Sequence, residues 1–73
     1  MNDYVFSEEM HVINYGTKQI KAYVESWGEE ITLEPKEFAC IRFSDLGGQF
    51  LEVAYYDDAI AVFFPARTIA EFD

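Results

Sequence analysis

The side chains that could do covalent chemistry are few, because Cys40 is the only thiol and His11 the only imidazole among 73 residues. A thiol nucleophile needs an imidazole at contact distance and a third group that orients that imidazole. The neighbours of Cys40 in "FACIRF" are mostly apolar, and no orienting group is evident beside His11. The sequence therefore predicts that Cys40 and His11 are structural strand residues and that the chain does not use thiol catalysis.

Carboxylates stand next to each other at Glu8-Glu9, Glu29-Glu30 and Asp57-Asp58. Neighbouring side chains of a strand point to opposite faces, so a doublet does not by itself make an acid–base pair. Asp57-Asp58 offers oxygen ligands for calcium, but the spacing of a calcium-binding loop is absent and Asp is an ordinary turn residue. One Cys and one His cannot supply the usual ligands of zinc alone. The sequence therefore predicts no enzyme, no cofactor and no metal site.

The composition is that of a small folded domain with a large negative charge. About half of the residues are apolar (51%), 18% are aromatic, and fourteen acidic residues against five basic ones give a net charge of -9. This charge disfavours binding to nucleic acid and to anionic membranes, and it favours a basic protein partner. The alternative is that the charge only keeps a small, aromatic-rich protein in solution.

Apolar residues recur with a period of two, which predicts short strands separated by turn-forming residues every eight to twelve positions. The predicted strands cover residues 11–14, 20–26, 30–34, 38–44, 49–56, 59–64 and 68–72. They predict a single all-β domain over residues 1–73, an antiparallel β-sandwich or partly open barrel of about seven strands. A short helix within residues 2–10 is the one alternative to strand.

The same alternation divides the side chains between two faces. Inner faces are predicted for Ile20, Ala22 and Val24, for Ala39, Ile41 and Phe43, and for Leu51, Val53 and Tyr55. Phe50, Tyr56 and Phe63 are then predicted to face outward. A contiguous exposed aromatic patch usually marks an interface. Closure into a barrel, or cover by the N-terminal segment, is the alternative explanation.

The stretch "ESWGEE" joins two predicted strands and contains the only tryptophan, Trp27. Gly28 can take the positive φ that a tight hairpin needs. The indole then either covers the end of the core or forms an exposed recognition tip beside Glu25, Glu29 and Glu30. We favour the anchor and keep the tip as the alternative.

Residues 12–64 resemble a pattern of small bacterial proteins to which no activity is assigned. The shared features are Glu-x-Trp-Gly-Glu-Glu, Leu33-Glu34-Pro35, Leu51-Glu52-Val53 and Asp57-Asp58-Ala59-Ile60. Ser26 and Lys36 depart from that pattern, which has Pro and Gly at these positions. The resemblance implies a similar fold and no particular function.

The predicted function is a non-catalytic, acidic protein–protein interaction domain, such as an inhibitor or immunity-type protein for a basic partner. The expected partner-binding residues are Trp27, Glu25, Glu29, Glu30, Tyr56 and Phe63. A self-associating module and a small-ligand or metal-binding domain are the alternatives. The first residues lack a signal peptide and Cys40 is unpaired, so a cytoplasmic location is expected.

Overall fold

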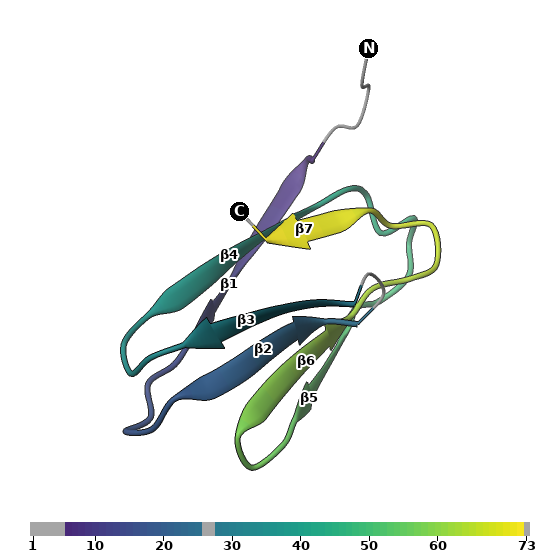
Figure 1. Ribbon diagram of the computed structural model, residues 1–73. Coiled ribbons are helices and arrows are strands. Elements are labelled where there is room, and N and C mark those ends of the chain that lie inside the picture. Colours follow the sequence, from purple (N-terminus) through teal and green to yellow (C-terminus); the bar gives the residue numbers. More distant parts are fainter. Residues whose placement is uncertain (1–5, 26–27, 73) are drawn as a thin grey trace.

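The computed structural model describes residues 6–25 and 28–72, and this part of the chain is built from strands without a helix (Figure 1). The strands are β1 (Glu8–Ile13), β2 (Ile20–Val24), β3 (Glu29–Leu33), β4 (Phe38–Phe43), β5 (Glu52–Tyr55), β6 (Ala59–Phe63) and β7 (Ala70–Phe72). The prediction of a small all-β domain is confirmed. The helix considered for residues 2–10 is not present in the described part, where Glu8 already begins β1. No described helix is long and apolar enough to cross a membrane.

The strands form two sheets, with order β1-β4-β7 in sheet A and β3-β2-β6-β5 in sheet B (Figure 1). Four of the described pairings are antiparallel, as predicted, but β2 and β6 are parallel, with Ala22 opposite Ile60 and Val24 opposite Val62. The chain leaves sheet B after β3, passes through β4 of sheet A, and returns in β5 before β6 is laid beside β2. A parallel pair requires such a long crossover, which a local pattern does not reveal.

The core lies between the two sheets, and the predicted inner faces of β2 and β4 form much of it. Val24 and Ile41 are fully buried, and Leu33 and Val62 are the other large side chains with almost no exposed surface. Burial of one such side chain contributes roughly 1.5–3 kcal/mol. The same alternation that was visible in the sequence therefore supplies the main stabilisation of the fold.

Asn14, directly after β1, is buried and joins the two sheets. Its Nδ2 donates to the carbonyl oxygens of Lys18 (2.8 Å) and of Leu33 in β3 (3.0 Å), and its Oδ1 accepts from the Gly16 N–H (2.9 Å). A buried amide is tolerated where its polar atoms are paired in this way. The sequence analysis did not single out Asn14, because its bond to Leu33, 19 residues away, depends on how the strands meet.

The turn from β3 to β4 contains Lys36, one of the two residues that depart from the pattern this chain resembles. The Glu37 N–H donates to the Glu34 carbonyl (3.0 Å), Pro35 occupies the second position, and Lys36 has a φ of 71°. This is the geometry of a type II turn, whose third position favours glycine. Lys36 therefore holds a left-handed conformation where the pattern has Gly.

The inner face of β5 is exposed, unlike the inner faces of β2 and β4. Val53 lies opposite Val62 and Tyr55 opposite Ile60, so both share the inner face as predicted. Both are nevertheless exposed, at 40% and 80%. Sheet A approaches sheet B most closely at β2 and β3, and β5 lies two strands away from β2 at the edge of sheet B. The expected orientation is correct, but the strand is not covered.

Candidate functional site

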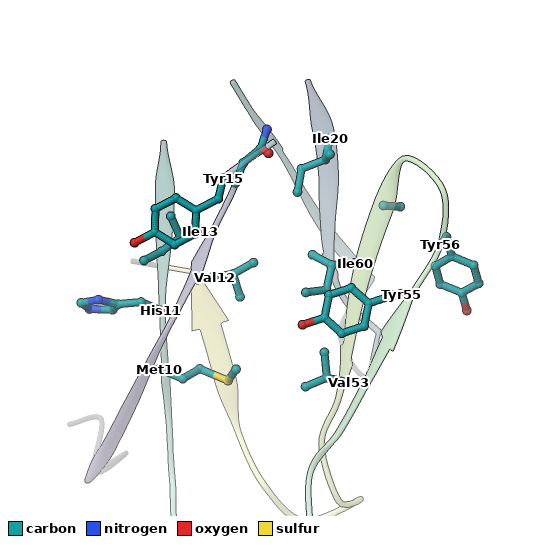
Figure 2. A pocket seen from close by; sticks show the side chains of 12 residues that line it. Met10, His11, Val12, Ile13, Tyr15, Ile20, Val53, Tyr55, Tyr56 and Ile60 are labelled. Carbon is teal, nitrogen blue, oxygen red and sulfur yellow. The ribbon is translucent and has the colours of Figure 1, made fainter. Parts of the chain in front are cut away.

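The uncovered face of β5 forms one wall of a groove between the two sheets (Figure 2). The opposite wall is β1, from which Met10 and Val12 point toward Val53 and Ile60. The groove encloses about 280 Å³. Alternation along β1 and β5 thus directs apolar side chains from both edge strands into one space that the core does not fill.

The mouth of the groove gathers most of the exposed apolar surface of the described chain. Eight large hydrophobic residues are exposed in the described part of the chain, and five of them line the groove: Ile13, Tyr15, Val53, Tyr55 and Tyr56. None of the twelve lining residues is Asp, Glu, Lys or Arg. An exposed apolar patch of this kind, with its polar residues confined to the margin, is typical of a binding surface.

Both walls of the groove are edge strands, so each has backbone N–H and C=O groups without a neighbouring strand on one side. The turn between β5 and β6 adds charge beside the groove, because Asp57 and Asp58 directly follow the lining residue Tyr56. The groove is therefore apolar inside, able to form backbone hydrogen bonds along its rims, and acidic at the end of β5.

The six residues predicted to bind a partner do not form one site. Trp27 lies outside the described residues, so the choice between anchor and tip stays a prediction. Phe63 shares the outer face of sheet B with Glu25, whose N–H donates to the Val62 carbonyl (3.0 Å). Tyr56, paired with Ala59 at the other end of that face, lies four residues from Phe63 in register, which is about 13 Å.

The adjacent carboxylates Glu29 and Glu30 point to opposite faces of sheet B, as expected for neighbouring residues of a strand. Glu29 is opposite Val24 on the inner face, whereas Glu30 is on the outer face and its Oε2 accepts from the Lys21 ammonium (2.8 Å). The hydrogen bond and the charge of Glu30 raise the pKa of Lys21 above its ordinary value of 10.5. Of the five predicted residues that the structure describes, only Tyr56 is among the residues that line the groove, and its ring points away from β1 (Figure 2).

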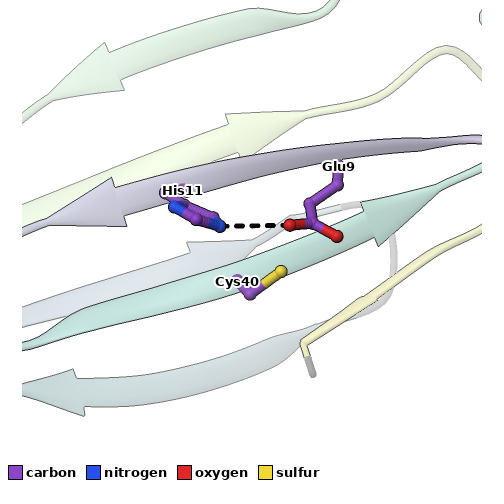
Figure 3. Close-up of side chains that lie close together, drawn as sticks. All are labelled: Glu9, His11 and Cys40. Carbon is purple, nitrogen blue, oxygen red and sulfur yellow. Dashed lines mark hydrogen bonds and ion pairs between the residues drawn. The ribbon is translucent and has the colours of Figure 1, made fainter.

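A second constellation lies on the outer face of sheet A, where Glu9, His11 and Cys40 come together (Figure 3). His11 is directly opposite Cys40 in the β1–β4 register, and its Nε2 is 3.2 Å from Oε2 of Glu9. The sequence analysis found no third group beside His11, and this was wrong. The spacing of Glu9 and His11 by two residues was the available signal, but the contact with Cys40 depends on strand register.

No family model, no curated protein and no solved structure matches this chain. The function therefore has to be argued from the groove and from the Glu9–His11–Cys40 cluster.

Proposed function

We propose that this chain is a non-catalytic protein-interaction domain whose groove between β1 and β5 holds an extended segment of a basic protein. The observation that supports this proposal is that five of the eight exposed large apolar residues of the described chain line the groove. Tyr15 and Tyr55, exposed at 84% and 80%, are the side chains with the most surface left to bury. Tyrosine is well suited to this role, because it combines a large apolar ring with one polar group.

The edge strands favour a peptide over a small molecule. An extended segment can add to a free strand edge through main-chain hydrogen bonds while its alternate side chains enter the apolar space. The groove offers both elements, since β1 and β5 are edge strands and their inner faces line it.

The charge of the chain favours a basic partner over a second copy. Two copies that each carry a charge of -9 repel each other, whereas a basic protein is attracted from a distance and is oriented by the acidic turn at Asp57 and Asp58. An inhibitor or immunity-type role in the cytoplasm is consistent with this chemistry, and the net charge of -9 disfavours nucleic acid as the partner.

The test compares a tyrosine that lines the groove with a phenylalanine outside it, and both residues are highly exposed. Tagged wild-type chain, Tyr55→Ser and Phe50→Ser are used to capture partners from lysate of the source cells. Phe50 is exposed at 87% but is not part of the groove, so it is the matched control. We expect wild type and F50S to retain the same basic protein through a wash at physiological salt, and Y55S to lose it.

Hydrogen exchange on the purified complex then locates the contact, and protection of β1 and β5 is expected. Equal retention by Y55S, or protection confined to the outer face of sheet B, would overturn the groove as the binding site. A dimeric mass of the free wild-type chain that Y55S converts to a monomer would assign the groove to self-association instead.

A further inference from the structure

We propose that Glu9, His11 and Cys40 form a zinc-binding site on the outer face of sheet A. The site is separate from the groove: His11 belongs to the β1 wall, but its imidazole points away from the apolar space (Figure 2). The three side chains converge on the opposite face of the same strand pair (Figure 3). This inference does not depend on the proposed function.

The distances suit a tetrahedral ion. The three candidate donor atoms all lie within 4.8 Å of one another, and Nε2 of His11 is 3.2 Å from Oε2 of Glu9. Donors bound to one tetrahedral zinc are about 3.3 to 3.7 Å apart, given Zn–N and Zn–O bonds near 2.1 Å and Zn–S bonds near 2.3 Å. The Glu9–His11 pair is already close to this separation, and Sγ of Cys40, which lies within 4.8 Å of both donors, has to approach them by about 1 Å at most.

The chemistry of the donors selects zinc over calcium or magnesium. A thiolate and an imidazole are soft or borderline ligands, whereas calcium and magnesium bind oxygen ligands almost exclusively. The thiolate of Cys40 and the carboxylate of Glu9 together balance the charge of a divalent ion. Binding releases the thiol proton to solvent, and a water molecule occupies the fourth position.

A neighbouring aromatic ring holds the His11 imidazole in place. The Phe38 ring packs against the His11 imidazole, with ring centroids 5.1 Å apart and an interplanar angle of 37°. Arg42 is opposite Glu9 in register, but its Nη2 lies 3.4 Å from Oε2 of Glu71 in β7, and its guanidinium lies over the Phe6 ring at 5.4 Å. The guanidinium is thus held between Glu71 of β7 and Phe6, which lies just before β1.

Zinc at this position would tie β1 to β4, because the ligands come from both strands. An ion that binds only the folded chain raises its stability in proportion to the logarithm of the ion concentration over Kd. The site is therefore expected to show both a binding isotherm and a metal-dependent melting temperature.

The experiment uses the full chain without a polyhistidine tag, in reduced form, titrated with zinc chloride by calorimetry and with cobalt chloride in an absorption spectrometer. We expect one zinc per chain. Cobalt is the spectroscopic probe, because a Co–thiolate bond gives charge-transfer absorption in the near ultraviolet. Cys40→Ser should abolish that absorption, and both Cys40→Ser and His11→Gln should weaken zinc binding by about a hundredfold.

Glu9→Gln and Glu8→Gln are the matched pair, because the two carboxylates are neighbours on β1 and point to opposite faces. E9Q should weaken zinc binding and E8Q should leave it unchanged, with circular dichroism confirming that each variant is folded. An absence of cobalt–thiolate absorption in the wild-type chain, or equal zinc affinity in wild type and C40S, would overturn the site.

Discussion

Val62 and Val53 are paired neighbours on the same inner face of sheet B, yet Val62 is 1% exposed and Val53 is 40% exposed. The difference lies in what covers them. Val62 belongs to the side of the sandwich where the sheets approach each other, whereas Val53 lies on the open side between β1 and β5. Alternation in a sequence identifies which residues share a face, but the position of the other sheet decides which part of that face becomes core.

The two sides therefore have different roles in the free energy of the molecule. Apolar surface on the closed side is removed from water by folding and stabilises the domain. The apolar surface of Val53, Tyr55 and Tyr15 is removed only when another molecule fills the groove. A domain of this size has a small margin of stability, so apolar residues left uncovered favour a role in binding.

The largest difference between the closed and open sides is expected when the two paired valines, Val62 and Val53, are each changed to alanine. Val62→Ala removes buried methyl groups and leaves a cavity, so we expect a loss of about 2 kcal/mol and a fall in Tm of about 8–16 °C. Val53→Ala should cost less than about 0.5 kcal/mol. Thermal unfolding followed by circular dichroism measures both, and similar losses at both positions would show that the groove is closed in solution.

Asn14 tests the polar link at one end of the open side. Asn14→Ala removes three side-chain hydrogen bonds that join β1 to the Lys18 segment and to β3, and we expect a loss of about 1–2 kcal/mol. Gln19→Ala is the control, because its amide also donates a hydrogen bond, to Glu34 at 2.6 Å, but on an exposed surface. Urea unfolding should give a clearly lower midpoint for N14A alone, and equal midpoints would count against the link.

Charge reversal separates the groove from the hairpin tip, which the sequence analysis kept as the alternative to a structural anchor. Changing both Asp57 and Asp58 to Lys should slow association with the basic partner about tenfold at low salt and reduce its salt dependence. Changing both Glu29 and Glu30 to Lys should have the smaller effect, because these residues lie on β3, at the other edge of sheet B. Rates measured by stopped flow in the reverse order would return the binding site to the β2–β3 turn.

The sequence was sufficient for features that depend on local alternation, such as the inner face of Ala39, Ile41 and Phe43. It was not sufficient for features that depend on which strands meet. The parallel β2–β6 pair, the exposed inner face of β5 and the contact of Cys40 with His11 all require the register or the order of distant strands. The predicted site was incomplete for the same reason, because Tyr15 and Tyr55 are far apart in the sequence and line one groove only through the order of the strands.

The turn between β3 and β4 contains a strained residue, and one substitution should relieve the strain. Lys36→Gly places glycine at a φ of 71° in the turn that carries the chain from sheet B to sheet A, and we expect a gain of about 0.5–1 kcal/mol. Lys36→Ala is the control, since it removes the same charge without relieving the backbone. A higher urea midpoint for K36G but not for K36A is expected, and equal midpoints would mean that the charge matters more than the conformation.

The smallest effect is expected for the Lys21–Glu30 pair, which lies on the outer face of sheet B, outside both the core and the groove. Because Glu30 raises the pKa of Lys21 in the folded chain, the stabilisation is complete below the ordinary value of 10.5 and is lost as pH rises through the raised pKa. The difference in unfolding midpoint between wild type and Lys21→Met should therefore be small and constant from neutral pH to about pH 9, and should vanish at higher pH. A difference that persists above the raised pKa would show that the alkyl chain of Lys21, and not its charge, accounts for the contribution of this residue.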